Sequence, residues 1–390
     1  MKTSAAAADY QKSEVATVRD IRDLVRDSAE TNIVFFENEV PSFVEGELEK
    51  LYANPHSSLN KFKILGRLDG ASTYFVNKGG EIIVLLLFRL QKGRVQVINE
   101  VMAISEGEIR RFANAVFTRF ESAAVISFTA IETNVHVLPF PFQRYNYSED
   151  LVISLPGSSE EYLASLGNAT RRNIKYYSNK LRRNFPSFNY QFYEKDNVTE
   201  QHVREVISLR SARFAEKKKV DFVDDKEVSR VLAMVRECGG MVGLATIDGN
   251  ICAGQISYRT GKNDFGAIIA HDPRYNEYWL GVITCYLTIC ECITRGAKEF
   301  HFQWGRQEYK YRLLGVQRDL DNVNIYRSHL SLVTNGSVAL SCFCRGQLRR
   351  AKLWVLDPKN RENVIARAAT RSIRYLQSAR QSGVNHKQQE

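Results

Sequence analysis

A pattern of strand, turn and helix signals occurs twice in this chain, and it restricts the fold more than any other feature of the sequence. In the first copy, apolar or alternating segments separated by glycine-containing turns predict strands over residues 72–77, from Ile82 onward and over 95–99. Ser105 and Glu108 then form a capping box, which predicts the start of a helix. Residues 125–131 predict a further strand.

The second copy repeats this order. Capping boxes that start at Asn197 and Asp224 predict helices ahead of it. The succession of hairpin, strand, helix and strand is then expected over residues 241–247, 251–259, 264–271, 281–295 and 299–304. Two copies predict a duplicated mixed α/β (α+β) fold, each copy a mixed sheet flanked by helices. A single irregular α/β domain is the alternative that the sequence leaves open.

The repeat divides the 390-residue chain into four parts. Residues 1–30 are small, polar and charged, and we expect them to form a tail. Residues 31–150 hold the first copy, and a proline-containing connection leads to the second copy within residues 151–340. Residues 341–390 are expected to form a basic helical extension.

The positive charge lies almost entirely in the second part of the chain. The formal net charge is +10, but residues 1–150 hold 17 basic and 20 acidic residues. Residues 341–390 alone hold 11 basic and 3 acidic residues. Such asymmetry indicates an anionic partner for the second part.

Several classes of protein are excluded by what the sequence lacks. The longest apolar run, Ile82–Phe88, is far shorter than the roughly 20 residues that span a bilayer. No apolar secretion signal follows Met1, which predicts a cytoplasmic protein. The 7 cysteines have spacings that predict neither a disulfide framework nor a metal site.

The joint between the strand ending at His271 and the helix starting near Gly281 is one candidate site. A helix that follows a strand presents free backbone N–H groups, which bind phosphate. The joint begins at Asp272 and contains one glycine, Gly281. A structural turn, with Gly281 packing the helix on the sheet, is the competing interpretation.

The segment from Arg295 to Lys310 is the second candidate site. Alternation along its strand places Phe300 and Phe302 on one face and His301 on the other. Glu308, Tyr309 and Lys310 follow the end of this strand, where open α/β sheets bind ligands.

The order of these motifs resembles a GNAT-like acetyltransferase family of bacterial cellulose and exopolysaccharide biosynthesis, often called CelD-like. The resemblance rests on the Gly281 helix, Arg295-Gly-Ala, Phe-His-Phe, Gly305 and Tyr309-Lys310, and it extends more distantly to the Fem-type aminoacyltransferases. It implies a duplicated GNAT fold with acetyl-CoA or another acyl-CoA as co-substrate, held near Gly281 and Asp272. His301 stands where the family has an acid, and Arg306 and Gln307 also replace acids.

These replacements leave His301 and Glu308 as candidates for the general base, because neither Arg306 nor Gln307 accepts a proton at neutral pH. Lys310 matches the family lysine and Tyr309 the family tyrosine. An acyl transfer needs a base for the acceptor and a cation or N–H group for the oxyanion, so Lys310 is expected to stabilise the oxyanion or anchor a phosphate.

Two further segments of the chain are rich in basic residues. Residues 171–183 contain six basic residues and no acid, and their spacing predicts an amphipathic helix whose Arg171 and Arg172 contact donor phosphates or tRNA. A solvated helix face is the competing interpretation. Residues 345–380 predict basic amphipathic helices, for which peripheral contact with the inner membrane and simple covering of the core both stay open.

The leading functional hypothesis is therefore a cytoplasmic GNAT-type acyltransferase. It would move an acetyl or other small acyl group from acyl-CoA to an amine or hydroxyl of a sugar or glycan precursor, without a metal. Aminoacyl transfer from aminoacyl-tRNA, as in the Fem-type enzymes, is the first alternative. A catalytically inactive scaffold in polysaccharide biosynthesis is the second.

Overall fold

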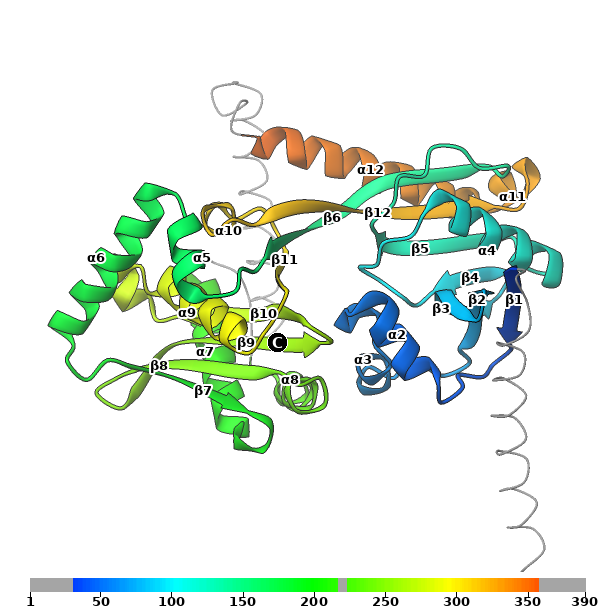
Figure 1. Ribbon diagram of the computed structural model, residues 1–390. Coiled ribbons are helices and arrows are strands. Elements are labelled where there is room, and N and C mark those ends of the chain that lie inside the picture. The colour runs from blue at the N-terminus through cyan, green and yellow to red at the C-terminus, as the bar shows by residue number, and fades with distance from the viewer. Residues whose placement is uncertain (1–30, 217–222, 358–390) are drawn as a thin grey trace, which may run out of the picture.

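The computed structural model describes residues 31–216 and 223–357. The predicted tail of residues 1–30, and the part of the basic extension that follows residue 357, lie outside the described residues. Within the described parts, twelve strands join into one mixed sheet in the order β1-β2-β3-β4-β5-β12-β6-β11-β10-β9-β8-β7. The sheet runs through the whole molecule, and two groups of helices pack on it (Figure 1).

The N-terminal unit is built from the first five strands and three α-helices. In chain order these are β1 (Thr31–Phe36), α2 (Val44–Tyr52), the short turn η1 (Pro55–Ser57), α3 (Leu59–Ile64), β2 (Ser72–Lys78), β3 (Glu81–Gln91), β4 (Arg94–Val97), α4 (Glu106–Arg119) and β5 (Val125–Ile131). The Ser105 hydroxyl accepts a hydrogen bond from the Glu108 N–H, which confirms the predicted cap of α4.

The C-terminal unit has the same succession of elements. It contains α5 (Ser159–Ser165), α6 (Asn168–Asn184), β7 (Asn189–Glu194), α7 (Glu200–Glu216), α8 (Asp225–Glu237), β8 (Met241–Ile247), β9 (Asn250–Thr260), β10 (Asn263–His271), η3 (Pro273–Tyr278), α9 (Leu280–Thr294), β11 (Glu299–Trp304) and α10 (Glu308–Arg312). In each unit an antiparallel hairpin leads to a pair of parallel strands that a helix connects. In the N-terminal unit α4 connects β4 to β5, and in the C-terminal unit α9 connects β10 to β11. The predicted duplicated mixed α/β fold is confirmed.

Two long strands connect the units. β6 (Phe142–Ser154) pairs with β11 of the C-terminal unit, and β12 (Val316–Tyr326) pairs with β5 of the N-terminal unit. β6 and β12 also pair with each other over most of their length. The boundary that we place between residues 150 and 151 therefore falls inside β6, a strand common to both units.

Some predicted elements differ from the observed ones. The helix expected to start in a capping box at Asn197 starts later, as α7, and the Thr199 hydroxyl accepts from the His202 N–H near its first turn. Asn197 instead ends a short 3-10 turn. The amphipathic helix predicted over residues 171–183 lies within α6, which Gly167 opens and which the extended Leu166 separates from α5.

Layers of helices enclose two main cores in the C-terminal unit. Phe300, Phe302 and Leu151 pack with α5 and α9 on one face of the sheet. Val206 of α7 and Val235 of α8 pack on the other face. The helices of the N-terminal unit approach this second face, where the Gly261 N–H donates to Glu49 and the Asn263 amide donates to the Ala53 carbonyl.

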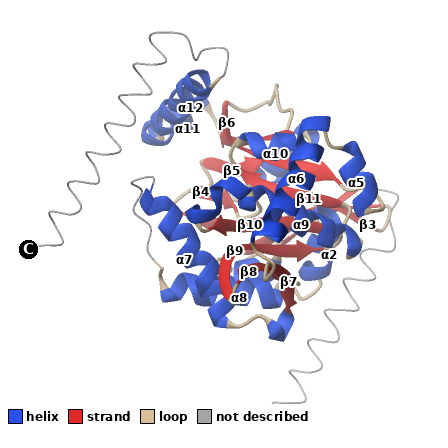
Figure 2. Ribbon diagram, turned by 90° about the vertical axis from the view of Figure 1, so that its left-hand side faces the viewer, coloured by secondary structure: helices blue, strands red, loops and turns tan. Residues whose placement is uncertain are grey.

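The last two helices in the described part of the chain are α11 (His329–Thr334) and α12 (Gly336–Leu356). α12 lies along β6, and Figures 1 and 2 show it at the margin of the molecule with one side away from the sheet. α12 begins before residue 341 and contains the first residues of the predicted basic extension.

Candidate functional site

The site lies where β10 and β11 separate. These neighbouring parallel strands pair only through Asn263–Phe265 of β10 and Glu299–His301 of β11. A β-bulge between Gly266 and Ile268 bends β10 at the next residues. Beyond the pairing, one backbone edge of β10 faces an opening rather than β11.

Two cavities occupy this opening. The larger has a volume of about 380 Å³ and extends from Gly266 and Gln255 to Phe302 and Lys310. The smaller, of about 180 Å³, lies at the start of α9 and is lined by His271, Trp279 and Gly281, among others. Arg213, Ile269 and Tyr309 line both cavities, so the two follow β10 toward the N-terminus of α9.

Gly281 lies at the smaller cavity, and its missing side chain has a packing reason. A Cβ at this position would lie 2.7 Å from Nδ1 of His271. The His271 ring, whose Nε2 is 2.8 Å from the Asn276 side chain, therefore occupies the space beside the helix. Trp279 precedes α9 in the left-handed conformation (φ 57°), with no side chain capping the helix.

Asp272 has a structural position. Its carboxylate accepts from the Arg274 N–H and pairs with the Arg274 guanidinium at 2.5 Å. These hydrogen bonds from Arg274 lower the pKa of Asp272. Asp272 caps η3 and is not among the residues that line the two cavities.

Lys310 is buried and bonded to the end of β11. Its Nζ donates to the carbonyl oxygens of Phe302 (3.1 Å), Gln303 (3.2 Å) and Trp304 (2.6 Å), so all three N–H donors have partners. Burial lowers the pKa of Lys310 to about 8. The lysine thus holds the backbone where β11 turns away from β10, and Gln303 has a positive φ of 56° there.

The neighbours of Lys310 in the motif lie in different surroundings. Tyr309 is half-buried between the cavities and packs edge-on against Phe302, and burial raises the pKa of its hydroxyl. Glu308 points to solvent and pairs with Arg312 at 2.7 Å. The structure brings Tyr309 and Lys310 to the cavities, and Glu308 lies outside them.

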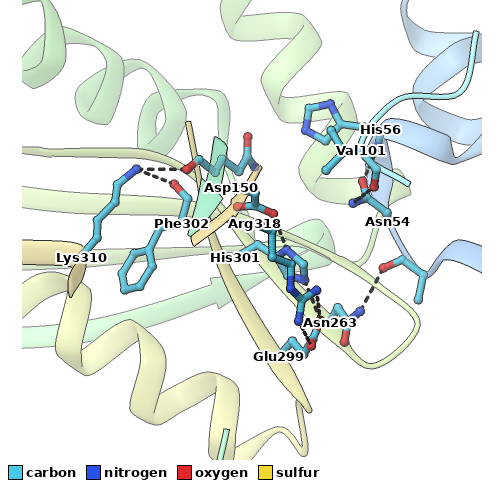
Figure 3. A network of polar contacts seen from close by, with 12 residues as sticks. Asn54, His56, Val101, Asp150, Asn263, Glu299, His301, Phe302, Lys310 and Arg318 are labelled. Atoms are coloured by element: carbon cyan, nitrogen blue, oxygen red, sulfur yellow. Dashed lines mark hydrogen bonds and ion pairs between the residues drawn. The ribbon is translucent and has the colours of Figure 1, made fainter. Parts of the chain in front are cut away.

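His301 lies on the opposite face of the sheet from Phe300 and Phe302, as alternation predicts, but it is buried. Its Nδ1 donates to Asp150 of β6 at 2.6 Å, and its Nε2 lies 3.2 Å from the Glu299 carboxylate. The ring stacks on Phe265, and Arg318 of β12 pairs with Glu299 at 2.5 Å. Figure 3 shows this buried cluster between the shared strands and β11.

The two carboxylates determine the charge of His301. Burial alone lowers the pKa of this imidazole, but the hydrogen bond to Asp150 and the contact with Glu299 outweigh burial and raise it. The contact with His301, helped by Arg318, lowers the pKa of Glu299 to about 2. The cluster therefore favours an imidazolium held between carboxylates, which is not the state of a general base.

A second histidine approaches the end of β11 from the N-terminal unit. His56 of η1 packs edge-on against Trp304, with ring centroids 5.3 Å apart. Its Nδ1 lies 2.7 Å from the Lys61 ammonium, and burial lowers the pKa of Lys61 to about 8. Both units thus contribute side chains to the surroundings of β11, as Figure 3 shows for His56 and His301.

The two predicted arginines of α6 lie beside the site rather than in it. Arg171 donates to the Ala164 carbonyl at 3.1 Å and to Asn168, and Arg172 is exposed. α6 passes next to the mouth of the smaller cavity, where Tyr177 packs on Trp279. Neither arginine is among the residues that line the cavities.

Sequence reasoning missed Arg213 of α7 and Gln255 of β9. Arg213 lines both cavities, and the buried Gln255 amide lies against Gly266 in the larger one. The only sequence signal for Gln255 is that it is a polar residue in an otherwise apolar strand, at a position whose side chain is expected to face the core. Arg213 carries no such signal, because its helix contains several basic and acidic residues and nothing in the sequence distinguishes Arg213 from the others.

Comparisons with known proteins agree with this geometry. Residues 168–311 match the family of acetyltransferase (GNAT) domains, a range that contains every residue lining the two cavities. No curated protein matches the sequence.

Solved structures extend the likeness to both units. FemX superposes with a TM-score of 0.54 and 9% sequence identity, covering 75% of this chain and 96% of FemX. L-PGS from Bacillus licheniformis has a TM-score of 0.47 at 15% identity, with 80% and 98% of the two chains covered. A tandem GNAT protein from the clavulanic acid biosynthesis pathway has a TM-score of 0.39 at 12% identity, with 76% and 98% covered.

Residues 168–311 of the C-terminal unit match an acetyltransferase domain of the GNAT type, and this match supports an acyltransferase. At 9% identity, the likeness to FemX concerns the fold. Among the described residues, no group of three or more His, Cys, Asp or Glu side chains is placed to hold a metal ion, and no helix is long and apolar enough to cross a membrane.

Proposed function

We propose that this chain transfers a small acyl group from a phosphate-bearing donor bound along the open edge of β10. The observation that carries this proposal is the pair of cavities between β10 and β11, which together lead from Lys310 to the N-terminus of α9. A backbone edge binds an extended chain, and a helix N-terminus binds phosphate. A long thioester donor such as acetyl-CoA or another acyl-CoA fits both features.

Three residues have separate roles in this proposal. The amine or hydroxyl of the acceptor attacks the thioester carbonyl carbon, the C–S bond breaks, and the leaving thiolate takes a proton. Tyr309 supplies that proton, because its raised pKa keeps the hydroxyl protonated and it lines both cavities. Arg213 contacts donor phosphate, and Lys310 positions the end of β11.

The acceptor follows from the sequence resemblance to enzymes of cellulose and exopolysaccharide biosynthesis. It would be an amine or hydroxyl of a sugar or glycan precursor, entering from the face that carries His56 and Trp304. His301 and Glu308 remain the sequence candidates for its general base. Of these, His301 is held between two carboxylates and Glu308 lies outside the cavities. The acceptor's proton therefore passes to solvent water, from which Tyr309 regains the proton that it gave to the thiolate.

Binding of coenzyme A tests the donor. Titration calorimetry with acetyl-CoA should show binding to the wild type and at least about tenfold weaker binding to Arg213→Ala, because a charge-assisted contact is lost. Arg236→Ala is the matched control, since Arg236 lies on α8 and donates to the Val198 carbonyl away from the cavities. The absence of heat at millimolar acetyl-CoA would remove coenzyme A as the donor.

Aminoacyl-tRNA is a second donor, favoured by the surface of α6. Arg172, Lys175, Arg182 and Arg183 are exposed there, and Tyr176 is 60% exposed among them. Cations bind a nucleic-acid backbone, and an exposed aromatic ring stacks on a base. If aminoacyl-tRNA is the donor, it should bind more tightly than a polyanion of equal charge across a salt series, and Tyr176→Ala should remove this difference.

A further inference from the structure

Helices α11 and α12 carry large apolar side chains that are exposed to solvent. Six of them are between 42% and 73% exposed: Leu330, Val333, Leu340, Phe343, Leu348 and Trp354. An exposed group of this size marks an interaction surface more often than a single exposed leucine does. We call these six residues the apolar surface of α11–α12.

This surface lies on the side of α12 that faces away from the sheet. Cys342, Gly346 and Arg349 form the opposite side, where Gly346 lies against Tyr145 and Arg349 donates to Asn146 and Glu149 of β6. In contrast, Leu340, Phe343 and Trp354 follow one another at spacings of three and eleven residues, which places them on one face of the helix. The side of the helix that faces the sheet thus makes polar contacts through Arg349, and the side that faces away carries exposed apolar side chains.

The charge around the apolar surface has one sign. Arg345, Arg350 and Lys352 are exposed at its flanks, and residues 329–356 contain no acidic residue. An outward apolar face with flanking cations is the arrangement of helices that lie in the interface of a membrane with anionic lipids.

We propose that the apolar surface of α11–α12 binds the surface of an anionic lipid bilayer, with α12 parallel to the membrane plane. The apolar side chains enter the boundary between headgroups and acyl chains, and the three flanking cations pair with lipid phosphates. α12 runs for 21 residues along the margin of the molecule, so its outward face reaches a flat surface without a clash from the sheet (Figures 1 and 2).

Charge argues against two other occupants. A second copy would bring Arg345, Arg350 and Lys352 of two chains together without an acidic partner on either helix. Residues 358–390 of the same chain are themselves basic, with 7 Lys and Arg residues against 2 acids. A negatively charged apolar phase complements both properties of this surface.

Docking would also fix the enzyme site relative to the membrane. Arg349 of α12 and Arg306, which follows β11, both contact the buried Glu149 carboxylate. Gln307, next to Arg306, lines the larger cavity. The proposal does not depend on which acyl donor binds, since it concerns a different face of the molecule.

Vesicle sedimentation of the full-length protein tests the proposal. The wild type should sediment with vesicles of phosphatidylcholine containing 30% phosphatidylglycerol, a composition chosen as about one anionic lipid in three. It should bind phosphatidylcholine vesicles at least roughly tenfold more weakly, and high salt should weaken binding to the anionic vesicles. No sedimentation with anionic vesicles, or equal binding to both compositions, would overturn the proposal.

Two variants separate the apolar and charged contributions. The triple variant Leu340→Gln, Phe343→Gln and Leu348→Gln should lose at least about tenfold in binding while keeping the thermal unfolding midpoint, because these side chains are already exposed. The triple variant Arg345→Gln, Arg350→Gln and Lys352→Gln should lose roughly a hundredfold, from about a factor of five for each cation.

Matched controls carry the same changes elsewhere. Ile33→Gln, Ile83→Gln and Val137→Gln replace exposed apolar residues of the N-terminal unit and should leave vesicle binding unchanged. Lys175→Gln, Arg182→Gln and Arg183→Gln remove three exposed cations of α6. If either control loses as much binding as its α12 counterpart, the surface of α11–α12 is not the membrane contact and the proposal fails.

Discussion

At the scale of single residues, the Lys310 ammonium group satisfies three consecutive carbonyls where β11 leaves the sheet. A buried cation with this set of acceptors organises the backbone, and replacing it leaves those carbonyls without a donor. The same residue lines the larger cavity, so its effects on stability and on donor binding need to be separated.

Replacement of Lys310 should therefore reduce stability even without ligand. Lys310→Met should lower the free energy of unfolding by about 2–4 kcal/mol, the scale of lost hydrogen bonds from a charged group. Chemical denaturation measures this loss. Glu308→Gln is the control two residues away and should change stability by less than about 0.5 kcal/mol, because its ion pair is exposed. An unchanged midpoint for Lys310→Met would refute the structural role.

Gly281 gives a second prediction from packing. Gly281→Ala places a methyl group against the His271 ring and should cost about 1–3 kcal/mol in thermal unfolding experiments. Gly46→Ala, in the exposed part of α2 with open space around it, should instead stabilise the protein by about 0.5–1 kcal/mol. Equal effects of the two substitutions would contradict the assigned contact.

The charge on His301 predicts a pH dependence of stability. Because the pKa of the folded state is raised, His301 stabilises the protein fully below its unfolded pKa of about 6.5, and this contribution is lost as pH rises through the folded pKa. Glu299, with its pKa lowered to about 2, stabilises above about pH 4.5 and loses this contribution as pH falls toward 2.

The wild type should thus exceed His301→Gln in stability most strongly between about pH 4.5 and 6.5. Thermal unfolding of both proteins from pH 4 to 9 measures the difference. Since His202 has a pKa lowered by burial, His202→Gln is a control that should not reproduce this profile. A difference that is constant across the range would show that His301 contributes by packing alone.

Sequence patterns identified the residues of the motif better than their roles. Tyr309 and Lys310 lie at the cavities, as their place after a strand indicates. The partners of His301 were not predictable, because Asp150 is 151 positions away along the chain and meets it only through the pairing of β6 with β11. Likewise, no local signal indicates that the His271 ring fills the space at Gly281.

At the scale of elements, hairpins and crossover helices followed from the sequence, and the long shared strands did not. β5, β8 and β11 occur with the predicted bounds because each has a short apolar or alternating run between turn residues. β6 and β12 contain many polar residues, such as the run Asp319-Leu-Asp-Asn, which are typical of loops. Their strand conformation comes from pairing with each other.

We expect the contact between α12 and β6 to depend on one side chain, Arg349. Arg349→Ala removes the contacts with Asn146 and the buried Glu149, and should raise hydrogen exchange in residues 336–356 while exchange in α9 stays unchanged. The expected cost is about 1–3 kcal/mol. The exposed neighbour Arg350→Ala should leave exchange as in the wild type. If hydrogen exchange in residues 336–356 of Arg349→Ala were as slow as in the wild type, apolar contacts alone would hold the helix.

At the scale of the whole molecule, the two units complete one sheet together. β12 follows the C-terminal unit along the chain but borders β5 of the N-terminal unit. Its removal would leave the edge of β5 unpaired, and such edges lead to aggregation.

Separating the chain between β5 and β6 tests this dependence. Residues 1–139 expressed alone should aggregate, and co-expression with residues 140–390 should give a soluble complex of both fragments, as measured by size-exclusion chromatography. An intact chain should unfold in one cooperative transition, because the shared strands couple the units. A soluble, folded fragment 1–139 would show that the N-terminal unit is independent of β12.

The placement of β12 also sets the order of events on the ribosome. β5 is complete once residue 131 has been synthesised, but the strand that covers its edge follows roughly two hundred residues later. At synthesis rates of about 5–20 residues per second, the nascent N-terminal unit waits about 10–40 s with an open strand edge. During that interval it depends on protection by the ribosome or a chaperone, so the yield of folded enzyme should respond to the speed of translation through the second unit.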